Sequence, residues 1–320
     1  MLAFSRLDRG RRLTIRARAK VNLGLEVLGR RPDGYHELLT CLSAIDLADR
    51  VRLEATGEGI EVACDAPGVP AGPDNLAWRA AELLRRATGT QAGGRIGIAK
   101  AIPVAAGLGG GSADAAAVLV GLNRLWGTGL DGTHLHALAV ALGMDVPFFL
   151  GTGPALAAGR GERLRRVRAG RGVPLVVVNP GFPLATREVY GRLEPGDMSR
   201  GSRVRALVRA LPGGPRAIAP RLVNGLEAAA SRLWSGLDGV KAALVEAGAL
   251  GAVMSGSGPT VIGIAPSPAA ARAIAAALAD RRWRVWVART VAGPALSVVR
   301  SAGPHGAGAG SGSTWGVAKR

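Results

Sequence analysis

The sequence is poor in lysine, in acidic residues and in aromatic side chains. Of 320 residues, 41 are lysine or arginine and 23 are aspartate or glutamate, which gives a formal net charge of +18. Lysine occurs only at positions 20, 100, 241 and 319. Nucleic acid, a membrane surface or an anionic small substrate could each explain such a charge. Because the arginines are scattered and no aromatic residues interleave with them, a compositional bias is favoured over a polyanion-binding surface.

Cysteine is equally scarce, and long apolar runs are missing. Cys41 and Cys64 are too few for a disulfide framework or a metal site in a chain of this length. No segment approaches the ~18 uninterrupted apolar residues of a membrane span, and no signal-peptide core is visible at the N-terminus. We therefore expect a cytoplasmic protein with no membrane partner and no nucleic-acid partner.

The length of the chain indicates about two domains. We predict a first domain over residues 1–168, a second domain over 169–300, and a disordered tail rich in Gly, Ala and Ser over 301–320. The first domain is expected to contain strands at 40–47, 50–55 and 60–63. Asp74 is expected to cap a helix whose apolar face includes Leu76, Ala80 and Leu84.

Glycine, by contrast, is abundant, with 48 residues, and four glycines cluster at positions 107 and 109–111. An apolar run with Ile96 and Ile98 precedes them and apolar residues follow at helical spacing, so this loop joins a strand to a helix. Without Cβ atoms, backbone N–H groups can approach a ligand closely. The start of the helix adds unpaired donors and the positive end of its dipole. The pattern predicts a loop that binds an anion such as phosphate.

The residues beside these glycines indicate which types of phosphate-binding loop the sequence can form. Ser112 and Asp114 stand where N-capping and first-turn residues are expected, which favours a binding loop over a flexible turn. The Gly-Lys-Ser/Thr of a Walker A loop is absent, and Ser112 replaces the third glycine of a dinucleotide fingerprint. Neither of the two common phosphate loops is therefore present.

Polar residues at three further places are candidates for a site. Apolar residues occupy the odd positions from 13 to 27, which is strand periodicity and places Lys20 and Asn22 together on the opposite face. A lysine in a chain that otherwise uses arginine indicates that a compact ammonium is needed there. Asp145 precedes a Val-Pro pair, which fixes its carboxylate on a turn. Tyr35 and His36 end a turn-rich segment, where they either contact a planar ligand or only cover the sheet edge.

Six motifs, taken in order, resemble those of the GHMP kinase superfamily. They are Ala19-Lys-Val-Asn-Leu23, Arg31-Pro-Asp-Gly-Tyr-His-Glu-Leu38, the run from Ile102 to Ala117, Asp145-Val-Pro-Phe-Phe149, Asn224-Gly-Leu-Glu227 and Met254-Ser-Gly-Ser-Gly-Pro-Thr260. The resemblance implies an α+β protein with two domains and an active site in the cleft between them. The N-terminal domain would be ribosomal-S5-domain-2-like and the C-terminal domain ferredoxin-like.

The same resemblance implies transfer of the γ-phosphate of ATP to an alcohol, with Mg²⁺ as cofactor and with no residue assigned as a metal ligand. It implies that Asp145 is the general base and that Lys20 is its partner. An alcohol is a poor nucleophile, and a positioned carboxylate that accepts its proton typically contributes ~10² to 10⁴ in rate. The ammonium would offset charge on the transferred phosphoryl group. The ATP-binding loop is expected to comprise Pro103, Val104, Ala105, Ala106, Gly107, Leu108, Gly109, Gly110, Gly111, Ser112 and Ala113.

Within the superfamily, the Tyr35-His36 loop and the triple glycine resemble one member in particular. Its substrate is a cytidine diphosphate sugar-alcohol, in which the 2-hydroxyl of a methylerythritol unit accepts the phosphate. By this resemblance, Tyr35 and Tyr190 sandwich the cytosine ring, His36 hydrogen-bonds its edge and Asn22 orients the alcohol. A monomer or weak homodimer is expected.

Two departures from the family pattern and two alternatives accompany this interpretation. Ala113 replaces a frequent second serine, and Gly225 replaces a frequent aspartate, which puts a direct ligand role of the segment 224–227 in doubt. One alternative is another small-molecule GHMP kinase, of the homoserine or mevalonate type. The other is a nucleic-acid-binding protein of related topology, which would leave Lys20, Asp145 and the glycine loop without a purpose.

Overall fold

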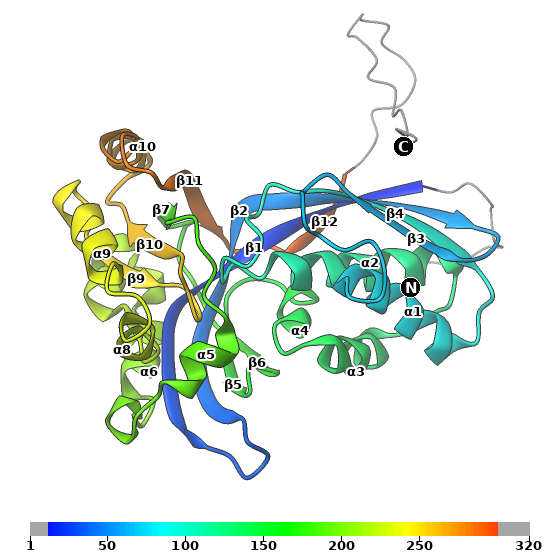
Figure 1. The fold of residues 1–320 in the computed structure, drawn as a ribbon, viewed down its shortest axis with the longest axis horizontal. Helices are drawn as coiled ribbons and strands as arrows, with labels where there is room; N and C mark the ends of the chain where they lie inside the picture. Colours follow the sequence, from blue (N-terminus) through cyan, green and yellow to red (C-terminus); the bar gives the residue numbers. More distant parts are fainter. Residues whose placement is uncertain (1–11, 300–320) are drawn as a thin grey trace, which may run out of the picture.

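The computed structural model describes residues 12–299, and its framework is a twelve-stranded sheet that carries helices (Figure 1). Two long antiparallel strands, β1 (Arg12–Arg30) and β2 (His36–Thr56), run through it. Figure 1 shows them descending to a hairpin tip at the bottom of the molecule. Register shifts interrupt their pairing near residues 18–20, 22–24 and 27–29. Each shift bends the β1–β2 pair, so that its two ends lie in different halves of the molecule.

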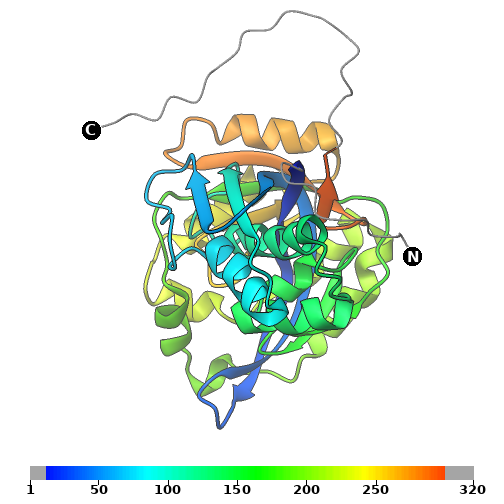
Figure 2. The same ribbon diagram turned by 90° about the vertical axis from the view of Figure 1, so that its right-hand side faces the viewer.

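The first half of the chain builds on β2. Strand β4 (Gly93–Ala99) pairs antiparallel with β2, β3 (Ile60–Cys64) pairs parallel with β4, and β5 (Ala155–Gly159) and β6 (Arg163–Arg166) extend from the hairpin end of β2. Four helices pack on one face, as Figure 2 shows: α1 (Leu76–Thr88), α2 (Gly110–Trp126), α3 (Gly132–Leu142) and α4 (Val146–Phe149).

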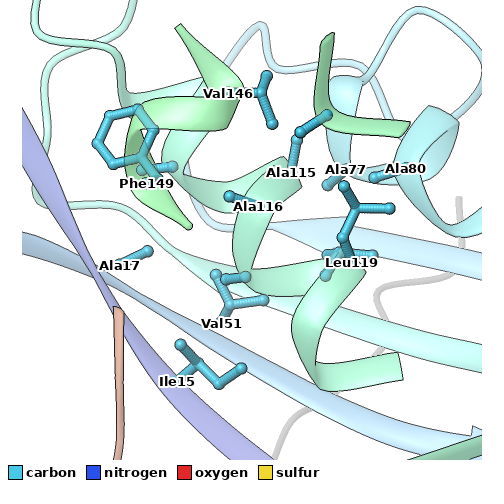
Figure 3. Close-up of a cluster of buried hydrophobic side chains, with 14 of the residues drawn as sticks. Ile15, Ala17, Val51, Ala77, Ala80, Ala115, Ala116, Leu119, Val146 and Phe149 are labelled. Carbon is cyan, nitrogen blue, oxygen red and sulfur yellow. The ribbon is translucent and has the colours of Figure 1, made fainter. Parts of the chain in front are cut away.

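The core between this sheet and its helices depends on small residues in α2. Ala115 and Ala116 are fully buried, and Figure 3 shows them among Ile15, Val51 and Phe149. A methyl group at Gly121 would overlap the side chain of Leu53 in β2. Small side chains thus let α2 lie close to the sheet, which places the first turn of this helix at the edge of β1.

The second half of the chain forms its own layer of strands. Strand β7 (Pro174–Asn179) lies between β10 (Val261–Ile264) and β11 (Arg284–Val291), and β9 (Gly251–Met254) pairs with β10. All six side chains of β7 are buried. The helices around this layer are α5 (Thr186–Gly191), α6 (Ser202–Ala210), α7 (Pro215–Ile218), α8 (Glu227–Ser231), α9 (Leu237–Glu246) and α10 (Pro268–Ala277). Short 3₁₀ turns lie at Pro195–Asp197, Leu211–Gly213 and Ala219–Arg221.

The two halves share strands. Strand β11 pairs with both β7 and β2, and β8 (Val223–Asn224) and β12 (Leu296–Val298) pair with β1. The expected α+β architecture is confirmed. The boundary near residue 168 stays a prediction, and the predicted tail at 301–320 lies outside the described residues. None of the helices within residues 12–299 is both long and apolar enough to cross a membrane.

Two local predictions were wrong. Residues 40–55 form one continuous strand, β2, where two strands were expected. Asn75, and not Asp74, caps α1: its Oδ1 accepts the N–H of Ala77 at 2.8 Å, and its Nδ2 donates to the carbonyl of Pro70 at 2.7 Å. An asparagine can satisfy both sides of this helix start, whereas a carboxylate has no donor for the loop carbonyl.

Candidate active site

A cavity of about 1110 Å³ opens where the middle of β1 meets the glycine loop and α5. Its walls come from both halves of the chain, because residues of β1, the loop before α2, α5 and the turn after β9 all line it. The predicted site residues that line it are Lys20, Asn22, Tyr35, His36, Gly107, Gly109, Ser112, Asp145 and Tyr190. The structure therefore brings the charged pair, the glycine loop and the aromatic residues to one cavity.

Lys20 is held in place by a chain of hydrogen bonds. Its ammonium lies 3.4 Å from the Asp145 carboxylate and donates to Oδ1 of Asn22 at 2.8 Å, although the side chain is only 5% exposed. The Nδ2 of Asn22 donates to the Thr40 hydroxyl, which donates in turn to the carbonyl of Gly24. As the alternation along β1 predicted, Lys20 and Asn22 lie on one face of the strand, where their side chains form a hydrogen bond.

Asp145 occupies the residue before α4 and keeps its carboxylate accessible. The side chain is 42% exposed and makes no capping hydrogen bond to α4. Phe149, four residues later, packs against the glycine loop: a Cβ on Gly109 would lie 3.0 Å from its Cζ and 2.9 Å from Cγ of Lys20. The loop therefore rests directly on the side chains that flank the charged pair.

The glycine loop contains three left-handed residues, Ala105 (φ +54), Gly107 (φ +73) and Gly109 (φ +70). Gly109 precedes α2, and no side chain caps this helix, so its first N–H groups have no capping side chain as a partner. The N–H of Lys20 donates to the carbonyl of Leu108 at 2.9 Å, which ties the loop to β1. Donors at a helix start beside a lysine form a site for an anion.

The predicted loop residues have different positions. Gly107, Gly109 and Ser112 line the cavity, whereas Ala106, Leu108 and Ala113 are buried in the core and Val104 is 58% exposed. Pro103, Ala105, Gly110 and Gly111 complete the loop without lining the cavity. Ser112 and Asp114 were expected at N-capping and first-turn positions, which was wrong: α2 has no side-chain cap and no acidic residue in its first turn.

Asp114 instead belongs to a buried charge cluster behind the loop. Lys100 donates to Asp49 at 2.5 Å and to Asp114 at 2.9 Å, and Asp49 also accepts the N–H groups of Ala101 and Ile102. Burial raises the pKa of Asp114 to about 7, against the opposing charge of Lys100. Burial alone would lower the pKa of Lys100, but the two carboxylates outweigh it and raise that pKa. The cluster joins the segment before the glycine loop to the helix after it.

The turn at residues 255–258 contributes Gly256 and Ser257 to the wall of the cavity. Ser255 accepts the N–H of Asn22 at 3.2 Å and donates to the carbonyl of Gly107 at 3.4 Å. Asn224, which is buried, supports this turn through Nδ2 bonds of 2.8 Å to the carbonyls of Met254 and Gly256. Among residues 224–227, for which a ligand role was in doubt, none lines the cavity; Asn224 braces a wall that does.

Tyr35, His36 and Tyr190 line a part of the cavity that we call its aromatic end. The Tyr190 ring lies 5.3 Å from the His36 ring, and burial followed by the charge of Asp145 raises the pKa of Tyr190. Burial, with the charge of Arg30, lowers the pKa of His36, which favours the neutral imidazole. Tyr35 is 54% exposed. The predicted pair of tyrosines thus lines one cavity, with the His36 ring tilted by 31° against that of Tyr190.

Some lining residues were not singled out from the sequence. Thr40 and Thr186 gave no local signal because they are ordinary residues of a strand and a helix start. Ser257 belongs to the Met254–Thr260 motif, but no role was assigned to it. Arg160 lies in Gly159-Arg-Gly-Glu162, where two glycines with positive φ flank it. That pattern marks a tight turn between strands and could have drawn attention to the arginine.

Comparison with known proteins gives one consistent result. The model described as GHMP kinases N terminal domain matches residues 75–153, and the model described as GHMP kinases C terminal matches residues 216–284. A 4-diphosphocytidyl-2-C-methyl-D-erythritol kinase from Pelotomaculum thermopropionicum is 48% identical over 87% of this chain and 98% of that protein. The kinase of the same name from Geobacter sp. strain M21 is 43% identical over 88% of this chain and 100% of its own length.

Solved structures agree with these relatives. A crystal structure of 4-(cytidine 5'-diphospho)-2C-methyl-D-erythritol kinase superposes with a TM-score of 0.77, at 42% identity, over 87% of this chain and 99% of that chain. A homoserine kinase from Cytophaga hutchinsonii superposes with a TM-score of 0.74 at 21% identity, over 93% of this chain and 100% of its own, which is a likeness of fold alone.

Proposed function

The chain belongs to the GHMP kinase family, and we propose that it transfers the γ-phosphate of ATP to the 2-hydroxyl of 4-diphosphocytidyl-2-C-methyl-D-erythritol, a step of non-mevalonate isoprenoid precursor synthesis. One observation carries the proposal: the Lys20–Asp145 pair, the start of α2 and the Tyr35-His36-Tyr190 cluster line the same cavity. The first two suit phosphoryl transfer to an alcohol, and the third suits a nucleobase.

In this proposal the substrate alcohol lies between Asp145 and the terminal phosphate of ATP. The Asp145 carboxylate accepts the hydroxyl proton while the oxygen attacks the γ-phosphorus and the bond to the β-phosphate oxygen breaks, so ADP leaves. Lys20 lies 3.4 Å from that carboxylate and orients it. The same ammonium and the N–H groups at the start of α2 stabilise charge on the transferred phosphoryl group.

The polar residues of the cavity fit a magnesium ion that is carried mainly by ATP. No group of three or more His, Cys, Asp or Glu side chains suited to a metal occurs within residues 12–299. Mg²⁺ in such enzymes is typically held by one or two protein oxygens together with phosphate oxygens and water. The Ser112 hydroxyl lines the cavity and could supply one such oxygen, which leaves the Asp145 carboxylate free to accept the proton of the alcohol. When bound, the ion would neutralise phosphate charge.

The aromatic end of the cavity would select the substrate. Tyr35 and Tyr190 would contact the faces of cytosine, and the neutral imidazole of His36 would hydrogen-bond its edge. Asn22, whose Oδ1 accepts from Lys20, would orient the alcohol. We further propose that the enzyme acts in the cytoplasm as a monomer or weak homodimer, without nucleic acid or membrane partners.

ADP release with ATP and Mg²⁺ tests the proposal. Four alcohols would be compared: 4-diphosphocytidyl-2-C-methyl-D-erythritol, free methylerythritol, homoserine and mevalonate. We expect turnover with the cytidyl compound alone. Faster turnover with another alcohol would preserve the phosphoryl-transfer chemistry but contradict the role of the aromatic end.

A further inference from the structure

The cavity carries more positive charge than its carboxylate balances. Arg30, Arg160 and Arg187 line it in addition to Lys20, whereas its acidic lining residue is Asp145. Lys20 lies 3.4 Å from Asp145, so that pair is neutral as a unit. Within residues 12–299, none of the three arginines has a carboxylate oxygen within 4.0 Å of its side-chain nitrogens. Three guanidinium groups are therefore available to an anionic ligand.

Arg160 differs from the other two because it also contacts Tyr35. Its Cζ lies 5.0 Å from the centroid of the Tyr35 ring, which is the distance of a cation–π contact. More than half of Tyr35 is exposed, so the guanidinium provides cover for an otherwise open aromatic face. A guanidinium bound through its face keeps its N–H groups free at the edge, where they can donate in the plane of the group.

The backbone holds Arg160 in a defined position. It lies in the turn between β5 and β6, flanked by Gly159 (φ +76) and Gly161 (φ +117), and its own N–H donates to the Glu162 carboxylate at 2.7 Å. Gly159 pairs with Leu38 in β2, two residues after His36. The turn is therefore anchored to the strand that begins beside Tyr35, and the contact between Arg160 and Tyr35 joins two anchored segments.

We propose that Arg160 is a specificity-determining residue that couples recognition of the base to recognition of the diphosphate. The inference rests on the proposed function. The guanidinium lies over the Tyr35 ring, and its N–H groups donate to a phosphate oxygen of the cytidine diphosphate group. Cytidine, which has no phosphate, would contact only the Tyr35 ring that Arg160 supports, whereas cytidine diphosphate would also accept hydrogen bonds from Arg160 itself.

Calorimetric titration of cytidine and of cytidine diphosphate tests this coupling. The proteins would be wild type, Arg160→Ala, Arg160→Lys and Arg165→Ala. Arg165 is an exposed residue of β6 and serves as a control for the change in net charge. For Arg160→Ala we expect the Kd of cytidine diphosphate to rise about tenfold or more, because a charge-assisted contact is lost. The Kd of cytidine should rise by about threefold or less, since an exposed cation–π contact is weak.

The two other variants test whether the planar group of Arg160 or only positive charge is needed. Arg160→Lys retains the charge but not the planar group, so its Kd for cytidine diphosphate should lie between those of wild type and Arg160→Ala. Arg165→Ala should match wild type. The inference would be overturned if Arg160→Ala weakened the binding of both ligands equally, or weakened it no more than Arg165→Ala does. In that case, turnover of the cytidyl substrate by the wild-type enzyme would leave the proposed function intact. Wild-type protein that neither binds cytidine diphosphate nor turns over that substrate would overturn both.

Discussion

Replacement of Gly107 by alanine should damage ATP binding, because this glycine lies where the loop meets the 255–258 turn. Its φ is +73, and a Cβ would lie 2.6 Å from the carbonyl oxygen of Ser255 and 3.0 Å from that of Gly258. A left-handed alanine costs roughly 1–2 kcal/mol. Overpacking typically adds about 1–3 kcal/mol, and both obstacles here are backbone atoms that cannot rotate away.

The total of about 2–5 kcal/mol must be relieved by moving the loop or the turn. Movement of the loop withdraws the donors at the start of α2, so the Kd of ATP should rise by roughly 30-fold or more, since 1.4 kcal/mol corresponds to a factor of ten. Fluorescence titration with a labelled ATP analogue would measure it. Thermal melting would record the part of the cost that appears as lower stability.

Gly111→Ala is the matched control. Gly111 lies in the first turn of α2 without a positive φ, and a Cβ there would meet only Cδ1 of Leu76, at 3.7 Å. Alanine is favoured over glycine inside a helix by roughly 0.5–1 kcal/mol, so the melting temperature should stay constant or rise. Wild-type ATP affinity and stability in Gly107→Ala, or equal damage in both variants, would refute the reasoning.

Three further predictions concern the charged groups and the aromatic end. Asp145→Asn should lower kcat by ~10² or more with little change in KM, because it removes the proton acceptor but not the cavity; steady-state kinetics near the wild-type rate would contradict this. Tyr35→Ala should raise KM for the cytidyl substrate about fivefold or more and leave KM for ATP unchanged, since base stacking on an aromatic ring contributes ~1–3 kcal/mol; an unchanged KM would remove Tyr35 from the site. Asp114 binds its proton more tightly when folded, with a pKa raised by burial from the ordinary 3.8 to about 7, so its contribution to stability is lost as pH rises from about 4 to about 7. In Asp114→Asn, the free energy of unfolding, measured by chemical denaturation at each pH, should depend less steeply on pH over that window. A pH dependence as steep as that of wild type would argue against the raised pKa.

Local patterns predicted much of the fold and the centre of the site. Alternation along β1 placed Lys20 and Asn22 on one face because a strand has a period of two, and the structure brings their polar atoms to 2.8 Å. The glycine cluster predicted a loop before a helix for an equally local reason. Gly107 and Gly109 adopt conformations that other residues avoid.

Contacts between distant segments could not be predicted in this way. Asp49 and Lys100 are 51 positions apart, and no periodicity indicates that they meet behind the loop. Asp114 looked like a first-turn residue because its position in the helix is visible in the sequence, whereas its rotation toward Lys100 depends on packing. Arg160 reaches Tyr35 across two strands, a contact set by the register of β5 on β2.

The most direct test of the account is the product of a reaction with the cytidyl substrate, ATP and Mg²⁺, analysed by ³¹P NMR. Wild-type enzyme should yield one new phosphate monoester on the 2-oxygen of the methylerythritol unit for each ADP released, and Asp145→Asn should yield this product at least ~10² times more slowly. A phosphate at another hydroxyl, or ADP release without a new ester, would contradict the placement of the alcohol between Asp145 and the glycine loop.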